Sequence, residues 1–182
     1  MPIQLWTVSQ DTPWVSTPIF SLNKVWSQSP QNPQKAGEFV YLDVPNWVNI
    51  IAITPDNNVV FVRQYRHGTR DVTLEIPGGM CDAGEDFLTA ANRELLEETG
   101  YGSASSQTIG VVAPNPAFQN NRCATVLFRD VFLKGSQSLD PHEEIEIELI
   151  PLNKVKALIQ SGAIEHSLVV AAFYHFFMME TE

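Results

Sequence analysis

Cysteine is scarce in this sequence, with only Cys81 and Cys123 among 182 residues. Two thiols without a C-x-x-C spacing exclude a disulfide framework and indicate no cysteine-based metal or redox site. The sequence also lacks any apolar run near the ~20 residues that a membrane helix needs. Its first residues do not have the basic and then apolar order of a secretory signal. We therefore expect a soluble, cytoplasmic protein without a membrane partner.

Basic residues are also few, with 11 Lys and Arg against 21 Asp and Glu, so the formal net charge is −10. This charge repels a polyphosphate backbone and argues against nucleic acid as a partner. The histidines lack an H-x-x-x-H spacing, which argues against a histidine-rich metal site. A G-x-S-x-G sequence is missing too, so an acyl-transfer triad has no support.

The chain length and a proline-containing polar loop indicate one main domain with a small addition. A chain of 182 residues, 44% of them apolar, is long enough for a sizeable core. The polar stretch 27–33 (SQSPQNP) is interrupted by prolines and is typical of a loop. We therefore expect a small N-terminal β segment over 1–45 and a main domain over 46–182.

Strand signals occur before this loop, and strand and helix signals alternate after it. Expected strands cover 14–25, as a hairpin or edge strands, then 39–44, 47–54, 59–64, 71–76, 107–113, 124–133 and 145–150. Expected helices cover 85–99, 154–160 and 167–178. The mixture predicts a mixed α/β sheet with helices packed against it.

The first expected helix carries an unusual number of carboxylates. At 100° per residue, Glu94, Glu97 and Glu98 fall within an arc of about 100°. The apolar stripe expected beside this arc consists of Leu88, Ala91 and Leu95. Repulsion between Glu94 and Glu98 costs an isolated helix about 0.2–0.5 kcal/mol. A hard divalent cation would turn this repulsion into a binding site, and the alternative is a solvated acidic face.

A longer pattern frames this helix: Gly79, five residues, Glu85, seven residues, and then the run 93–101 (RELLEETGY). It resembles the signature G-x5-E-x7-R-E-U-x-E-E-x-G-U of the Nudix hydrolases, where U is a bulky aliphatic residue. Tyr101 departs from the final aliphatic position. The resemblance implies an α/β class Nudix fold, an α/β/α sandwich around a mixed sheet, here with a small N-terminal β addition.

The resemblance also implies roles for individual residues. Metal ligands for Mg²⁺, with Mn²⁺ as a possible substitute, would be Glu94, Glu97, Glu98 and the backbone carbonyl of Gly78. Structural residues would be Gly79, Glu85, Arg93 and Gly100, with Glu85 and Arg93 forming an ion pair. The general base would be Glu94, acting through a metal-bound water, or a carboxylate of the late acidic loop 140–144 (DPHEE). In that loop we favour Glu144, then Glu143.

Other segments resemble the ADP-ribose and nucleoside diphosphate sugar pyrophosphatases of this family. They are the run 63–66 (RQYR) and the run 74–79 (LEIPGG), together with Pro116, fifteen residues after Tyr101. Expected substrate-binding residues are Arg66, Arg63, Glu75, Pro116, Phe118 and Arg122. Strand alternation places Arg63 and Arg66 on opposite faces, and we favour Arg66 as the phosphate ligand. Trp47, Tyr65 and Phe118 all remain candidates for stacking on the base.

The resemblance thus implies Mg²⁺-dependent hydrolysis of ADP-ribose or a related nucleoside diphosphate sugar, such as GDP-mannose, to a nucleoside monophosphate and a sugar phosphate. It further implies a homodimer in which the N-terminal segment 1–45 is the dimerisation element and 46–182 is the Nudix hydrolase domain. Two alternatives stay open: a Nudix pyrophosphohydrolase of nucleoside triphosphates or capped RNA, and a non-catalytic module that senses ADP-ribose. The acidic balance disfavours RNA, and the three intact glutamates disfavour a sensor.

Overall fold

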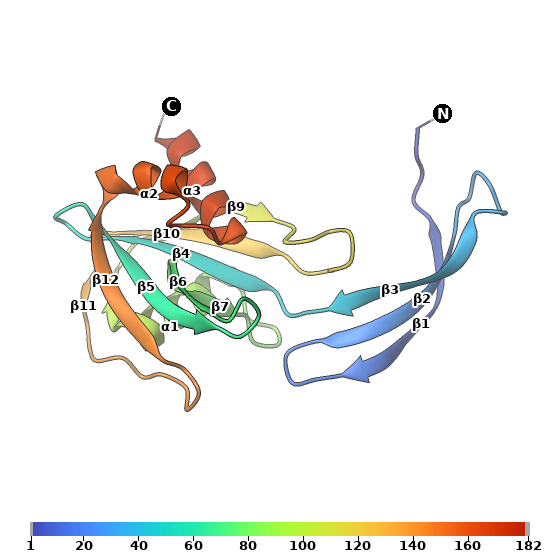
Figure 1. Cartoon of the computed structure of the whole chain (residues 1–182), viewed down its shortest axis with the longest axis horizontal. Helices are drawn as coiled ribbons and strands as arrows, with labels where there is room; N and C mark the ends of the chain where they lie inside the picture. Colours follow the sequence, from blue (N-terminus) through green and yellow to red (C-terminus); the bar gives the residue numbers. More distant parts are fainter. Residues whose placement is uncertain (1, 181–182) are drawn as a thin grey trace. The chain divides into compact units, whose positions relative to one another are not determined.

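The protein divides into two compact units. The structure is a computed structural model that describes residues 2–180 (Figure 1). The first unit comprises Met1–Pro45 with Ala113–Arg122, and the second comprises Asn46–Val112 with Cys123–Glu182. Within the described residues no helix is both long enough and apolar enough to cross a membrane.

An antiparallel three-stranded sheet forms most of the first unit. Its strands are β1 (Thr7–Ser16), β2 (Ser21–Gln28) and β3 (Ala36–Asp43). The turn between β1 and β2 contains Pro18, which has no N–H to contribute to a ladder, and Thr17 accepts the backbone N–H of Phe20 at 3.0 Å. The segment 113–122 joins this unit, because Leu42 donates its backbone N–H to the carbonyl of Phe118 at 2.7 Å.

A seven-stranded mixed sheet forms the centre of the second unit. Its main order is β12 (Ile145–Pro151), β5 (Asn58–Arg66), β4 (Trp47–Ile53), β10 (Cys123–Arg129) and β9 (Ser106–Val112). Two further strands pair at its side: β6 (Asp71–Glu75) with β5, and β7 (Gly78–Met80) with β4. The pair β10–β4 is parallel, whereas β4–β7, β5–β6 and β12–β5 are antiparallel. A small ribbon pairs β8 (Tyr101–Gly102) with β11 (Phe132–Leu133).

Helices cover both faces of this sheet, which confirms the expected sandwich (Figure 1). One face packs on α1 (Phe87–Thr99), and the other packs on α2 (Val155–Ser161), which follows the 3₁₀ turn η1 (Leu152–Lys154), and on α3 (Ser167–Met179). Alternate residues of each strand supply the two cores. In β4, Ile50 belongs to the core beneath α1, while Ile51 belongs to the core beneath α3.

Several details differ from the sequence-based expectation. The sequence predicts strands from residue 14, but β1 already begins at Thr7, and β7 (Gly78–Met80) lies where no strand is expected. The strand expected over 124–133 is interrupted at Asp130, whose φ of 52° is left-handed and ends β10. Leu88, expected on the buried stripe of α1, is 39% exposed, whereas Ala91 and Leu95 are fully buried. Leu88 and Leu95 point in nearly the same direction around the helix. The periodicity therefore predicted the direction correctly, but the core does not cover the helix at Leu88.

Candidate active site

The helix α1 is defined by its two ends. Asp86 caps its N-terminus, because its carboxylate accepts the backbone N–H groups of Leu88 at 2.9 Å and Thr89 at 3.0 Å. At the other end, Gly100 has a φ of 71° and donates its N–H to the carbonyl of Leu96 at 2.8 Å. These caps fix which residues lie on the helix and therefore where its glutamates point.

The three glutamates of α1 lie in very different environments. Glu98 is only 4% exposed, the Glu94 side chain is 13% exposed, and the Glu97 side chain is 45% exposed. Glu98 accepts the backbone N–H of Gly78 at 2.9 Å. Burial raises the pKa of Glu98 to about 8, and burial also raises the pKa of Glu94. This face is therefore no solvated acidic surface, because two of its three carboxyl groups are removed from water.

Arg93 organises the carboxylates around it. Its guanidinium donates to Glu85 at 2.9 Å, to Glu94 at 2.9 Å and to Glu97 at 3.2 Å. The same side chain donates to the carbonyl of Met80 at 3.0 Å, which ties α1 to β7. The hydrogen bonds from Arg93 to Glu85 are the largest cause of the raised pKa of Arg93. Arg93 thus offsets the repulsion that the helix sequence would otherwise impose.

The two glycines of β7 permit a close approach to the carboxylates. A Cβ at Gly78 would lie 2.2 Å from the carbonyl oxygen of Val48. A Cβ at Gly79 would lie 2.3 Å from an oxygen of Glu94. Both distances are far below van der Waals contact, so a side chain at either position would displace the neighbouring strand or the Glu94 carboxylate.

The donor set of this cluster suits a hard divalent cation. Its candidate ligands are carboxylate and carbonyl oxygens, which such ions prefer. Glu94 and Glu143 each act to raise the pKa of Glu98, so the negative charges of these carboxylates lie near Glu98. Within residues 2–180, no three side chains of His, Cys, Asp or Glu are arranged so that they could hold a metal ion together. Arg93 engages Glu94 and Glu97, and Gly78 engages Glu98, so these contacts would have to rearrange around an ion.

Arg66 lies beside this cluster and is bound to Glu75. Glu75 accepts the Nε and Nη2 groups of Arg66, each at 2.7 Å, and this hydrogen bonding is the largest cause of the raised pKa of Arg66. The charges of Glu98 and Glu143 act in the same direction. Burial acts to raise the pKa of Glu75, but hydrogen bonds from Arg66 and Thr73 hold it below its usual value.

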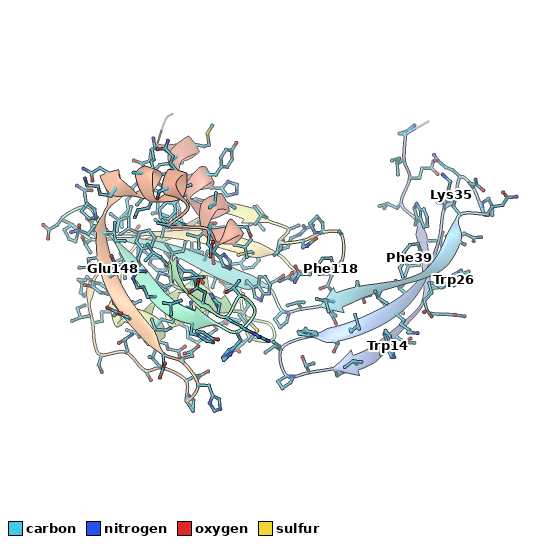
Figure 2. All side chains as sticks on the ribbon, viewed as in Figure 1. Trp14, Trp26, Lys35, Phe39, Phe118 and Glu148 are labelled. Carbon is cyan, nitrogen blue, oxygen red and sulfur yellow. The ribbon has the colours of Figure 1, made fainter. Side chains whose placement is uncertain are left out.

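Arg63 has a different partner. Its Nε donates to Glu148 at 2.8 Å, across the pair β5–β12. Figure 2 labels Glu148 on β12. Alternation along β5 thus separates Arg63 from Arg66, as the sequence indicated.

The acidic loop before β12 is attached to the end of α1. The Gln137 amide donates to the carbonyl of Glu98 at 2.7 Å and to that of Ile145 at 3.1 Å. Ser138 donates its backbone N–H to the carbonyl of Glu97 at 2.8 Å. Glu143 and Glu144 follow in this loop and are both exposed. The negative charge of Glu143 acts to raise the pKa of both Glu94 and Glu98.

The remaining expected substrate residues lie in other parts of the chain. Pro116, Phe118 and Arg122 are exposed and belong to the first unit. Figure 2 labels Phe118 on its segment. Of the candidate stacking aromatics, Trp47 is half-buried on β4, whereas Tyr65 is exposed on β5.

Sequence reasoning missed the residues that hold the site together. Thr73 donates its hydroxyl to Glu75 at 2.6 Å, and Gln137 anchors the acidic loop. For Thr73 a signal existed, because it lies two residues before Glu75 and strand alternation places both on one face. For Gln137 no local pattern pointed to α1, which is 39 residues away in the chain.

The two cysteines take no part in this site. Both are buried free thiols, and burial raises the pKa of Cys81 to about 11 and that of Cys123 to about 12. Thiolate is the reactive form, so both are inert at neutral pH. A pocket of about 680 Å³ elsewhere in the second unit, lined in part by Lys156, Phe176 and Phe177, contains none of the carboxylates described above.

Comparison with known proteins agrees with this geometry. Residues 45–173 match the family model of the NUDIX domain. The chain is 31% identical over 137 residues to a methanol dehydrogenase activator of Bacillus methanolicus, covering 75% of this chain and 74% of that protein. It is 28% identical over 128 residues to an ADP-ribose pyrophosphatase of Bacillus subtilis, covering 70% and 69%.

A solved structure of an ADP compounds hydrolase has the same fold. It superposes with a TM-score of 0.82 at 22% identity, covering 98% of this chain and 96% of that one. The matched family segment contains the capped helix, the three glutamates and the glycines of β7. Members of this family generally need a divalent metal ion, in keeping with the oxygen donors gathered here. The chain belongs to the Nudix family.

Proposed function

We propose that this protein hydrolyses the diphosphate bond of ADP-ribose or a related nucleoside diphosphate sugar, such as GDP-mannose. The products would be a nucleoside monophosphate and a sugar phosphate. One observation carries the proposal: Arg66, a cation suited to phosphate, lies within electrostatic reach of the buried carboxylate Glu98. Glu98, which could bind a cation, and Arg66, which could bind an anion, are therefore close enough to interact. An anionic diphosphate with a bound cation requires both kinds of group. The relative named ADP-ribose pyrophosphatase supports this substrate class.

For the metal we propose Mg²⁺, with Mn²⁺ as a substitute, held by Glu94, Glu97, Glu98 and the carbonyl of Gly78. When bound, such an ion offsets the charge of the diphosphate and lowers the pKa of a bound water. The N–H groups of Arg66 that Glu75 does not engage would bind a phosphate oxygen. In the second unit, Glu75 is proposed to act through Arg66. In the first unit, Pro116, Phe118 and Arg122 stay predicted substrate-binding residues.

The substrate class is tested by product analysis. Purified protein with Mg²⁺ is incubated with ADP-ribose, GDP-mannose, other nucleotide sugars, nucleoside triphosphates and dinucleoside polyphosphates. A monophosphate and a sugar phosphate, formed from the sugars alone, are the expected products. Activity confined to triphosphates would contradict the proposal, and binding of ADP-ribose without turnover would favour a sensor instead. Incubation with EDTA is expected to abolish turnover, and excess Mg²⁺ to restore it.

For the general base we propose Glu143, although the sequence had favoured Glu144. The reason is that the charge of Glu143 acts on Glu94, Glu98 and Arg66 together. Replacing Glu143 with glutamine is expected to lower kcat by about 10²–10⁴-fold, the usual contribution of a general base. The matched variant Glu144→Gln should lower kcat much less. The reverse order in steady-state kinetics would return the role to Glu144.

We also propose that the N-terminal β segment over 1–45, which forms most of the first unit, makes a homodimer contact. Trp14 and Trp26, labelled in Figure 2, are 60% and 44% exposed on a sheet whose β1 residues are all exposed. Lys24 lies 4.4 Å from the Trp14 ring centroid and pairs with Glu38 at 3.1 Å, so these two charges offset each other. A second copy could bury these aromatic side chains.

The dimer is tested by light scattering after gel filtration. The wild-type protein is expected to have about twice the chain mass of 20.3 kDa. The substitution Trp14→Glu should yield the monomer, because it places a charge in the apolar contact. Tyr174→Glu, at a 62% exposed position on α3, is the matched control and should leave the dimer intact. A monomeric wild-type protein would contradict the proposal.

A further inference from the structure

A buried polar chain leads from β6 to the guanidinium of Arg66. The Glu75 side chain is only 3% exposed, yet three donors reach its carboxylate. Arg66 donates from Nε to one oxygen and from Nη2 to the other, both at 2.7 Å. The hydroxyl of Thr73 donates to the first oxygen at 2.6 Å. The carboxylate is therefore fixed in its plane by three short, charge-assisted hydrogen bonds.

This arrangement determines how Arg66 presents its remaining donors. A guanidinium has five N–H groups, and the fork with Glu75 uses two of them. Because the fork is planar, the orientation of the Glu75 carboxylate sets the orientation of the whole guanidinium. The side chain of Arg66 is 42% exposed, so its other N–H groups have access to a ligand. Any rotation of Glu75 would move them.

The hydroxyl of Thr73 opposes this rotation, because it donates to Glu75 independently of Arg66. It has one proton, and its two possible acceptors are Glu75 at 2.6 Å and the carbonyl of Gln64 at 3.4 Å. The shorter, charged contact takes the proton. His166 approaches the other Glu75 oxygen only to 3.9 Å, beyond hydrogen-bonding distance. Thr73 is itself buried, so water does not replace its hydroxyl.

We propose that Thr73 is a positioning residue for substrate binding: its hydroxyl holds Glu75, and Glu75 holds the guanidinium of Arg66 toward the diphosphate. This inference rests on the proposed hydrolysis of nucleoside diphosphate sugars. Thr73 does not touch the substrate. Its loss should weaken binding through Arg66 alone, which separates this role from a general effect on the fold.

The test is a double-mutant cycle measured by steady-state kinetics on ADP-ribose with saturating Mg²⁺. Thr73→Val removes the hydroxyl at nearly constant shape and should raise KM about tenfold with little change in kcat, as expected for one hydrogen bond to a charged group. Thr73→Ser restores a hydroxyl and should restore KM to within about threefold. Arg66→Ala should raise KM about 100-fold. In the double variant the Thr73→Val penalty should disappear, because the two residues act as one unit.

Melting temperatures separate this role from a structural one. Thr125→Val makes the same change at a buried site on β10 and should leave KM unchanged. If an active wild type shows a Thr73→Val penalty that persists in the Arg66→Ala background, the inference is wrong. The same holds if Thr73→Val lowers the melting temperature without changing KM. A wild type that turns over none of the nucleotide sugars overturns the proposed function, and this inference with it.

Discussion

Replacing Glu98 with glutamine is expected to lower kcat by about 10²–10³-fold while the protein stays folded. The carboxylate is a proposed metal ligand, and a bound metal stabilises the charge of the transition state by several kcal/mol. Each loss of about 1.4 kcal/mol lowers the rate tenfold. The fold should tolerate the change because Glu98 is buried with a pKa raised to about 8, so its neutral form is already favoured at pH 7. A glutamine carbonyl can still accept the N–H of Gly78.

Kinetics and thermal unfolding together check this expectation. Turnover is measured with saturating nucleotide sugar over a range of Mg²⁺ concentrations, and the melting temperature is measured without metal. Glu146→Gln, which makes the same charge change at an exposed site on β12, is the matched control and should behave as wild type. Near-wild-type kcat in the Glu98 variant would contradict its assignment as a metal ligand.

Gly79→Ala is expected to reduce kcat/KM by about 10²-fold through a single added methyl group. Its Cβ would lie 2.3 Å from an oxygen of Glu94, so the carboxylate has to move away. That carboxylate is the end of a flexible side chain, and the fold can therefore absorb the shift. The chemistry cannot, because misplacing a reacting or ligating group by about 1 Å commonly costs about 100-fold in rate.

The matched control for this variant is Gly37→Ala. A Cβ at Gly37 meets its nearest atom, on Phe39, only at 3.9 Å, which is ordinary contact. Its kinetics should equal those of the wild type. A metal titration adds a second measurement, since Gly79→Ala should also raise the Mg²⁺ concentration needed for half-maximal rate. If Gly79→Ala retains full activity and unchanged metal dependence, Glu94 does not need the position that the structure shows.

Local patterns in the sequence were sufficient to predict most elements of the fold. The helix expected over 85–99 is α1, and its ends coincide with an Asp cap and a left-handed glycine, both of which are local signals. The strand expected over 47–54 is β4, because a run of β-branched residues next to a turn is also local. The Nudix fold was implied by the resemblance of the run in and around α1 to the family signature, and the family model confirms it.

Local patterns did not determine which charged groups are buried. The helical periodicity placed Glu97 and Glu98 on one face, yet the Glu97 side chain is 45% exposed and Glu98 only 4%. It also placed Leu88 on the buried stripe, where it is exposed. Whether a side chain of α1 is buried depends on which other part of the chain covers it. Here the covering strands are distant in the sequence.

The sequence by itself therefore determined the elements, the family and the chemical type of the site, because helix periodicity, caps and motif spacing act over a few residues. Only the tertiary structure decided that Glu98 is buried against Gly78, that Arg66 pairs with Glu75 while Arg63 pairs with Glu148, and that the segment 113–122 joins the N-terminal sheet. Each of these depends on contacts between residues far apart in the chain. Such contacts are set by packing and desolvation, which no local window of sequence contains.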